Sequence, residues 1–509
     1  MSMLTAKLLK HFQLRSMVVN SRTCTKWERA ISLARSKSSA TPTVEQHKYS
    51  TEPQMQLRDI PGPSTIENLT MIARKGFLKQ HVYMAEMFAR FGPMFRQSVP
   101  GGRHVVYISD PVDMEHVFRS QENNNPYRGD MLIADYARKS GLDRGINGDG
   151  ESWSVYRKLV APKLLQLGAL KPYFTEILNV ADDTVANFTD GKNVNLQDHL
   201  TKWGAESVVV VLFGLRIGTS YKSMNERAEA FIDAVNGHFY AEAKLIFSVP
   251  LHKHFETPTL KRAYRHVDTQ LAIMREFAAE TRKHETEIAR NSLLTKLEQH
   301  DELSEENLMF LCQNLLIAAV HTTASSTLQL IDTLSKHPEV QRKAFEEIRL
   351  VLGDGQQAPS YQQLSEMKYL RALIKEGFRY NTAPPGNIRI TKAPVTVRGY
   401  HIPPGTTVIL STIASKEMQR QKYNDPEKFA PERWLRRTDK EIHPFSSLPF
   451  SFGRRACLGR RVVNMEMALL VLRILQKYEI LERKDPVNWV CHTVVGPDKP
   501  YSFYLKKRH

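Results

Sequence analysis

The segment from Phe450 to Gly459 has the clearest capacity for chemistry in this chain. It reads Phe-Ser-Phe-Gly-Arg-Arg-Ala-Cys-Leu-Gly, which places Cys457 in a loop bracketed by Gly453 and Gly459. Glycines let a backbone turn tightly and approach a flat group, and the amides at the start of a helix favour a negative sulfur. Arg455 can pair with a carboxylate. The pattern favours a thiolate ligand to the iron of haem, and the alternative is a buried structural cysteine.

A helix and several strands must position this loop. The apolar stretch 462–475 after the cysteine predicts a helix, and 304–336 predicts a long one, capped by Ser304 and ended by Pro338. Residues 94–109 predict a β-hairpin around Pro-Gly-Gly, and 111–350 are mostly helical in pattern. Strand character returns at Val395–Val397 and 405–410, with a turn expected at Gly399-Tyr-His, and again over 490–507.

Composition limits the class of protein. The chain has 509 residues, 41% of them hydrophobic, which is enough for a large core. Its four cysteines, Cys24, Cys312, Cys457 and Cys491, are too widely spaced for a disulfide framework or a zinc site. No run approaches the roughly 18 apolar residues that span a bilayer. Basic residues are not interleaved with aromatics, which argues against nucleic acid as a partner.

The first 50 residues differ from the rest. They hold nine Lys and Arg against two acids, Glu28 and Glu45, and are rich in Ser and Thr, as mitochondrial transit peptides are. The alternative is a basic tail without a targeting role. Without this +7 segment the chain still keeps about +10 of its net charge of +17, which suggests an acidic protein partner or an anionic membrane surface.

The cysteine loop resembles the haem-binding signature Phe-x-x-Gly-x-Arg-x-Cys-x-Gly of the cytochrome P450 family. All five positions match, at Phe450, Gly453, Arg455, Cys457 and Gly459. The resemblance implies a mainly α fold with small β-sheets, as a single large domain over residues 58–507 after the 1–50 leader. It also implies haem b, buried between the long central helix and the cysteine loop, with Cys457 as axial ligand to the iron.

The middle of the long helix reads Ala318-Ala-Val-His-Thr-Thr. It resembles the family segment that crosses the haem face, where Thr322 matches the threonine that helps deliver protons to bound oxygen. The alternative is a hydroxyl bonded back to its own helix. His321 stands where the family has an acid, and imidazole can also relay protons. Thr322 and His321 are therefore the candidate catalytic residues, and a satisfied buried histidine is the alternative for His321.

Further matches concern support for the haem. Glu376 and Arg379 match the family's Glu-x-x-Arg, and Arg433 matches the arginine that completes a structural triad. Trp153 and Arg157, which are four residues apart, match a pair that faces the haem propionates. Arg389 matches a third propionate ligand, and an exposed arginine is the alternative there.

A basic face is expected beside the cysteine. It combines Lys368, Arg371, Lys375, Arg460 and Arg461, to which Arg454 and Lys477 add. A solvated surface is the alternative, but the leader and the Arg460-Arg461 pair resemble the mitochondrial branch of the family. That branch takes electrons from an acidic [2Fe–2S] ferredoxin and its NADPH-ferredoxin reductase.

By family alignment, the substrate pocket is expected from 128–145, 236–255, 314–318, 384–388 and 493–497. The apolar segment around 244–251 predicts peripheral contact with a membrane, for which the inner mitochondrial membrane on the matrix side is expected, or else it is core.

The resemblance implies a mitochondrial monooxygenase that hydroxylates a lipophilic substrate, with a sterol or steroid favoured. A xenobiotic-oxidising enzyme, an isomerase or dehydratase that needs no reductant, and a haem-binding sensor are the alternatives.

Overall fold

The computed structural model describes residues 55–508, with short gaps. These gaps are residues 100–102, 123–125, 129–131, 192, 222–223, 247–250, 354–356, 382, 413–422, 424, 436–441 and 484. The predicted leader, residues 1–50, lies outside the described residues, as does the Pro-Gly-Gly turn of the predicted hairpin.

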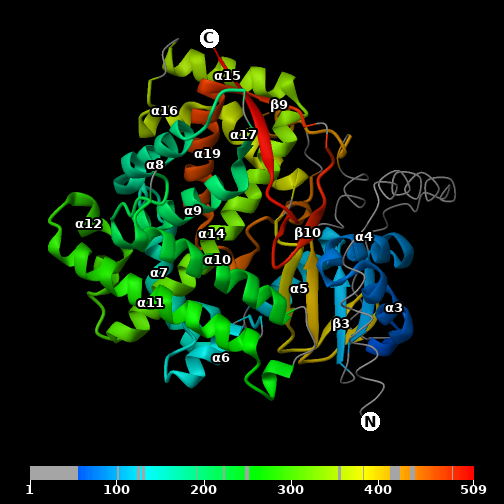
Figure 1. Cartoon of the computed structure of the whole chain (residues 1–509). Coiled ribbons are helices and arrows are strands. Elements are labelled where there is room, and N and C mark those ends of the chain that lie inside the picture. Colours follow the sequence, from blue (N-terminus) through cyan, green and yellow to red (C-terminus); the bar gives the residue numbers. More distant parts are fainter. Residues whose placement is uncertain are drawn as a thin grey trace. The chain divides into compact units, whose positions relative to one another are not determined.

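Helices form most of the described chain, and most of them lie on the left of Figure 1, with the first two helices and the strand Arg103–Ile108 on the right. In chain order they are α3 (Thr65–Lys75), α4 (Gln80–Phe91), α5 (Pro111–Glu122), α6 (Leu132–Lys139), α7 (Gly150–Leu165), α8 (Phe174–Ala186), α9 (Leu196–Phe213), α10 (Glu226–Ile246), α11 (Pro258–Lys283), α12 (Glu287–Asn291), α13 (Leu293–Leu297), α14 (Glu305–Ser335), α15 (Pro338–Leu352), α16 (Tyr361–Glu366), α17 (Lys368–Tyr380) and α19 (Arg460–Lys477).

Helix α14 is the predicted long helix and forms the centre of the helical part. The side chain of Ser304 caps it by accepting from the amide of Asn307 at 3.2 Å, as the sequence predicted. Helices α9, α10, α11, α17 and α19 all pack against it. It is long and apolar enough to span a membrane by composition, but 67% of its most apolar 18-residue window is buried inside the protein. We therefore treat it as a core helix.

Among the described residues, the strands form four small sheets. The largest of these sheets joins β2 (Met94–Val99), β3 (Arg103–Ile108), β8 (Thr407–Ser411) and β5 (Gly386–Ile390) in that order. Since β8 pairs in parallel with β3, two segments about 300 residues apart in the sequence lie side by side. The other sheets join β1 (Met55–Gln56), β7 (Tyr400–Ile402) and β6 (Val395–Val397); β10 (Trp489–Cys491) and β11 (Val495–Pro497); and β4 (Asn193–Asn195), β12 (Ser502–Lys507) and β9 (Tyr478–Leu481).

The prediction of a turn at Gly399-Tyr-His is wrong, because the two turn residues are Arg398 and Gly399. Both have positive φ, 51° and 79°, and they form a two-residue hairpin turn. Val397 then pairs directly with Tyr400, so Tyr400 and His401 belong to β7. The sequence shows glycine but not that its basic neighbour shares the left-handed conformation.

A buried carboxyl lies among three of the helices that surround the cysteine. Glu466 on α19 is 3% exposed, and the nearby hydroxyls of Thr323 on α14 and Ser207 on α9 act to lower its pKa. Burial outweighs them and raises the pKa of Glu466 to about 8, so the group is mostly protonated and uncharged at neutral pH. The carboxyl therefore lies between α19, α14 and α9 without burying a charge.

Candidate functional site

The cysteine loop folds back on itself just before α19. The amide of Cys457 donates to the carbonyl of Phe450 at 2.8 Å, and that of Ala456 donates to Gly453 at 3.0 Å. Gly453 has φ +69°, and a Cβ there would overlap the carboxylate of Glu122. Gly459 differs, since its φ of −78° suits any residue. A Cβ there would make only ordinary van der Waals contact with the Cys457 sulfur at 3.7 Å, so neither the backbone nor the packing of the protein atoms requires glycine at this position.

The surroundings of Cys457 act on its thiol in opposite directions. The side chain retains accessible surface, yet the protein atoms packed around the sulfur desolvate it and raise its pKa above the ordinary value. Hydrogen bonds from the amides of Gly459 and Arg460, and the charges of Arg157 and Arg128, lower that pKa. Because a metal ion deprotonates a coordinating thiol outright, this arrangement suits a metal-bound thiolate better than a free one.

Four arginines gather on the side of the loop that faces α7. Arg455 donates to the carbonyls of Pro126 and Gly148 at 2.8 and 2.9 Å and pairs with Asp149. Its guanidinium lies 3.7 Å above the ring of the buried Trp153. Burial, followed by the charge of Arg128, lowers the pKa of Arg455 to about 9. The positive charges of these arginines therefore act against one another, and Asp149 is the carboxylate that pairs with Arg455.

Arg389 and Arg157 complete this cluster. Arg389, on β5, is 2% exposed and donates to the Ser451 hydroxyl at 3.2 Å, so it is not the exposed arginine that was the alternative. Burial, followed by the charge of Arg128, lowers its pKa to about 10. Arg157 lies one turn after Trp153 on α7, where burial lowers its pKa and the charge of Cys457 opposes this.

Arg128 is the member that sequence reasoning missed. The carbonyl of its neighbour Tyr127 accepts from the amide of Ile390 at 2.9 Å, which places Arg128 beside β5. The Nε atom of Arg128 and the Nη1 atom of Arg455 are buried without a hydrogen-bond partner among the described residues. Unpaired buried donors are rare, and here they are cationic. They fit the carboxylates of a bound group such as the two propionates of haem. No motif in the sequence marks Arg128.

The three residues of the predicted structural triad, Glu376, Arg379 and Arg433, meet in one network. Glu376, fully buried on α17, accepts from Arg379 at 2.7 and 2.8 Å and from Arg433 at 3.5 Å. Trp434 Nε1 donates to the same carboxylate at 2.8 Å. Arg379 also donates to the carbonyls of Pro426 and Lys428. The network therefore fastens α17 to the segment 426–434, as a structural support would.

Thr322 bonds to its own helix. Its hydroxyl donates to the carbonyl of Ala318 at 2.7 Å and contacts that of Ala319 at 3.1 Å. Its side chain is only partly buried. The hydroxyl oxygen keeps acceptor capacity in this position, so the bond to the helix and a role with protons are compatible.

The side chain of His321, the residue before Thr322, packs against α10. Its ring stacks on Phe239 of α10 with centroids 3.8 Å apart, and it donates to the backbone carbonyl of Val235. Burial lowers its pKa to about 3, and the nearby His238 and His492 act in the same direction. The ring is therefore neutral at physiological pH. The geometry favours a buried histidine over a proton relay at this position.

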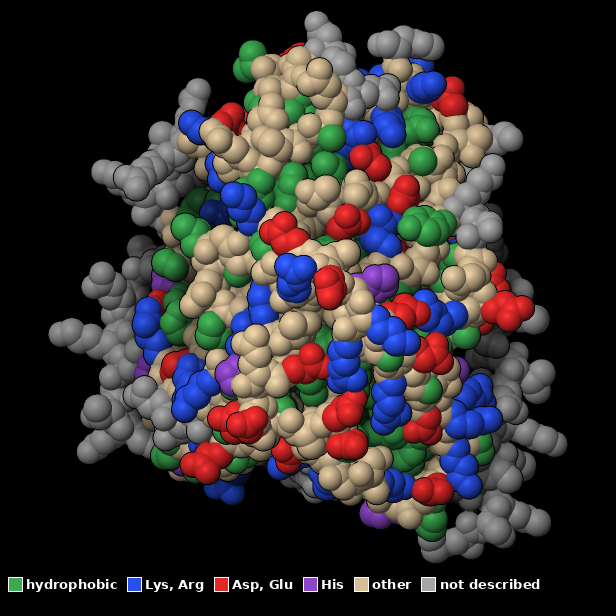
Figure 2. Space-filling view, turned by 90° about the vertical axis from the view of Figure 1, so that its left-hand side faces the viewer, with side chains coloured by type: hydrophobic (Ala, Val, Ile, Leu, Met, Phe, Trp, Pro, Cys, Tyr) green, Lys and Arg blue, Asp and Glu red, His purple; other side chains and the backbone are tan. Residues whose placement is uncertain are grey.

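Four of the five residues of the predicted basic face are exposed. Lys368, Arg371 and Lys375 are exposed on one side of α17, which packs against α19, whose first residue is the exposed Arg460. Arg461 is only partly exposed, and its Nε atom is buried without a hydrogen-bond partner among the described residues. Lys375 also lies 3.9 Å from the Trp434 ring centroid. By contrast, basic and acidic side chains are interspersed on the face seen in Figure 2, over the side of Figure 1 that carries α12.

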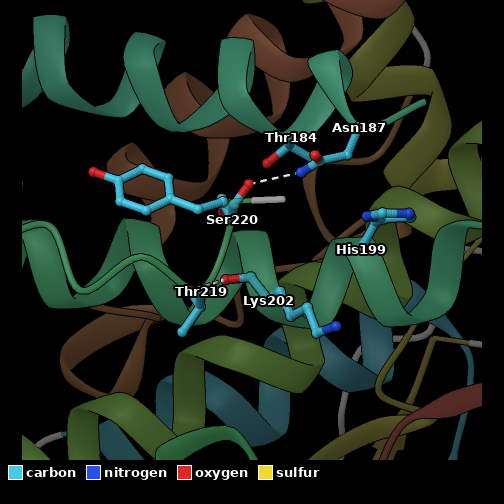
Figure 3. A pocket seen from close by; sticks show the side chains of 7 residues that line it. Thr184, Asn187, His199, Lys202, Thr219 and Ser220 are labelled. Carbon is cyan, nitrogen blue, oxygen red and sulfur yellow. Dashed lines mark hydrogen bonds between the residues drawn. The ribbon is translucent and has the colours of Figure 1, made fainter. Parts of the chain in front are cut away.

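Two pockets lie among the described residues away from the cysteine. One, of about 200 Å³, is polar and lies between α8, α9 and residues 219–221 (Figure 3). Asn187 donates to the Ser220 carbonyl at 2.7 Å, and Lys202 pairs with Asp198 at 2.7 Å. The Ser220 hydroxyl is buried without a hydrogen-bond partner among the described residues. The other brings predicted pocket segments 236–255 and 493–497 together on α14, beside His321.

Comparison with known proteins agrees with this site. A family model described as Cytochrome P450 matches residues 61–505. The chain is 31% identical to the mitochondrial 25-hydroxyvitamin D-1 alpha hydroxylase of Mus musculus, covering 89% of this chain and 93% of that protein. It is 29% identical to the mitochondrial 1,25-dihydroxyvitamin D(3) 24-hydroxylase of Rattus norvegicus, covering 88% and 89%. A crystal structure of the cytochrome P450DA heme domain superposes with a TM-score of 0.75 at 20% identity, covering 88% and 98%.

Proposed function

Because this chain belongs to the cytochrome P450 family and is a haem-thiolate monooxygenase, we propose that it hydroxylates a sterol or steroid in mitochondria. One atom of O2 enters a C–H bond as a hydroxyl group, and the other leaves as water with two protons and two electrons. We further propose that the electrons come singly from an acidic [2Fe–2S] ferredoxin supplied by an NADPH-ferredoxin reductase. The names of the mitochondrial vitamin D hydroxylases among its relatives support the substrate class.

The residues present fit haem b. Cys457 is the proposed iron ligand, held by the turn from Phe450 to Gly459. Arg128, Arg157, Arg389 and Arg455, with Trp153 stacked below Arg455, are proposed to hold the propionates. When bound, a thiolate-ligated haem activates dioxygen. Thr322, on α14, is proposed to hold a proton at its hydroxyl. The observation that carries the assignment of a haem site is the pair of buried arginine donors without partners among the described residues, on Arg128 and Arg455.

A reconstitution experiment tests the function. The haem-loaded protein is assayed with a mitochondrial ferredoxin, its reductase and NADPH against a sterol panel, with mass detection of products gaining one oxygen atom. Ferredoxin-dependent hydroxylation of a sterol is expected. A thiolate-type Soret band without any oxygenated sterol would overturn the substrate class and leave the enzyme class standing. Turnover without reductant would instead contradict the electron route.

Replacing Arg128 by glutamine should weaken haem retention. A charge-assisted hydrogen bond contributes about 1.5–3 kcal/mol, so a roughly ten- to hundredfold faster loss of haem is expected. The measurement is haem transfer from the loaded protein to an excess of an apo-globin scavenger. Arg138→Gln is the matched control, because Arg138 is exposed and pairs with Asp135 on the surface. Equal rates for both variants would contradict the assignment of Arg128.

Reversing one charge on the basic face should impair ferredoxin docking. For Arg371→Glu, which is exposed on α17, the apparent KM for ferredoxin should rise about tenfold at low salt. The increase should shrink with ionic strength as screening sets in. Lys283→Glu, at the end of α11 and on a different helix, is the control. A salt-independent effect, or an equal effect of both variants, would argue for a merely solvated surface.

Peripheral membrane contact is proposed through the end of α10 and the segment after it. Ile246, Leu251 and Phe255 are 48%, 54% and 70% exposed, and their apolar side chains could enter a lipid surface. The matrix side of the inner mitochondrial membrane is the proposed location. Residues 247–250 of this segment lie outside the described part of the chain.

A further inference from the structure

A small cavity of about 30 Å³ lies where α14 meets α10, α9 and the β10–β11 hairpin. Its lining combines apolar residues, among them Phe239, Leu328, Val494 and Pro497, with the polar residues Gln197, Thr201, Tyr240, Ser325 and His492. His321 reaches it from α14. The volume is roughly that of one water molecule or one hydroxyl group.

The ring of His321 presents a fixed acceptor to this cavity. It donates to the carbonyl of Val235, while its Nε2 atom is buried and has no hydrogen-bond partner among the described residues. The side chain is 6% exposed. In a neutral imidazole with one nitrogen donating, the other carries a lone pair. The stack on Phe239, with Tyr240 packed nearby, fixes the plane of the ring.

A second acceptor of the same kind lines the cavity. Gln197 Oε1, from α9, is also buried without a partner among the described residues. Leaving a buried polar atom unpaired costs about 1–3 kcal/mol. Two such atoms around one small cavity indicate that a donor of hydrogen bonds occupies it.

We propose that His321 Nε2 is the anchor of a subsite for one hydroxyl donor, filled either by the hydroxyl of a lipophilic substrate or by a bound water molecule. The substrate form rests on the proposed function, whereas the water form does not. Val494, Gly496 and Phe239 line this cavity and belong to the segments expected to line the substrate pocket, which is why a substrate hydroxyl is one of the two proposed occupants. His321 then selects substrates by their distal hydroxyl rather than relaying protons.

Two measurements on the haem-loaded protein test this subsite. The first is a high-resolution crystal structure without ligand and with cholesterol, examined for an oxygen within hydrogen-bond distance of His321 Nε2. The second is the dissociation constant, from Soret titration, of cholesterol and of its 3-deoxy analogue for wild type and His321→Phe. Phenylalanine keeps the stack on Phe239 and removes the acceptor. His492→Phe is the matched control, because it changes another ring that lines the cavity.

A preference for cholesterol of roughly two- to tenfold, lost in His321→Phe and kept in His492→Phe, supports the substrate form. An oxygen at Nε2 in the ligand-free crystal, without any effect of His321→Phe on the preference, supports the water form. Absence of such an oxygen in both crystals, together with an unchanged preference, overturns the subsite. If neither sterol binds, the proposed substrate class fails, and the ligand-free crystal alone decides the subsite.

Discussion

Replacement of Cys457 by serine should abolish turnover and remove the Soret shift of the reduced carbon monoxide complex. The sulfur is the only iron ligand that the described loop offers, and hydrogen bonds from the amides of Gly459 and Arg460 are placed for it. Loss of an outer-shell partner typically costs 10–100-fold in metal affinity or activity. Loss of the ligand itself should therefore exceed about 100-fold. The measurements are the difference spectrum and the rate of product formation.

Cys312→Ala is the matched control for this prediction. Cys312 is a free, fully buried cysteine on α14, and burial, followed by the charge of Glu298, raises its pKa to about 12, which suits an inert thiol. Its replacement should leave the thiolate spectrum unchanged. A serine variant at position 457 that kept the shifted Soret band would contradict the ligand assignment and restore the alternative of a structural cysteine.

Glu376→Gln should destabilise the protein more than any surface substitution. The change leaves the buried guanidinium of Arg379, and that of Arg433, without their carboxylate. Removing one partner of a buried ion pair costs about 3–5 kcal/mol, since the remaining charge is left uncompensated. We expect a lower urea midpoint of the haem-loaded protein, followed by the Soret band, and a lower yield of loaded protein.

The control breaks an ion pair of similar length on the surface. Glu346 pairs with Arg342 at 2.8 Å on α15, with both side chains more than half exposed. Glu346→Gln should cost no more than about 1 kcal/mol. If the two variants unfolded at the same urea concentration, the Glu376 network would not be the support that we propose for the cysteine loop.

Much of the fold could be predicted because the relevant patterns are local. Ser304, the acids after it and Lys336 set the ends of α14 by capping and helix polarity, within one residue of the prediction. The helix after Cys457 follows in the same way from a stretch rich in apolar residues. The turn before β7 could not be placed, because the positive φ of Arg398 depends on the pairing of β6 with β7.

The residues of the candidate site likewise fall into those that local sequence patterns indicate and those that only the tertiary structure reveals. The sequence by itself indicated Cys457 and its glycines, Glu376 with Arg379, and Thr322, because they lie in short local motifs that resemble those of the family. Only the tertiary structure revealed Arg128, which reaches the site when residue 127 pairs with a strand about 260 residues later. It also decided the direction of His321, since packing against α10 and burial, rather than the residue type, set the charge and contacts of an imidazole.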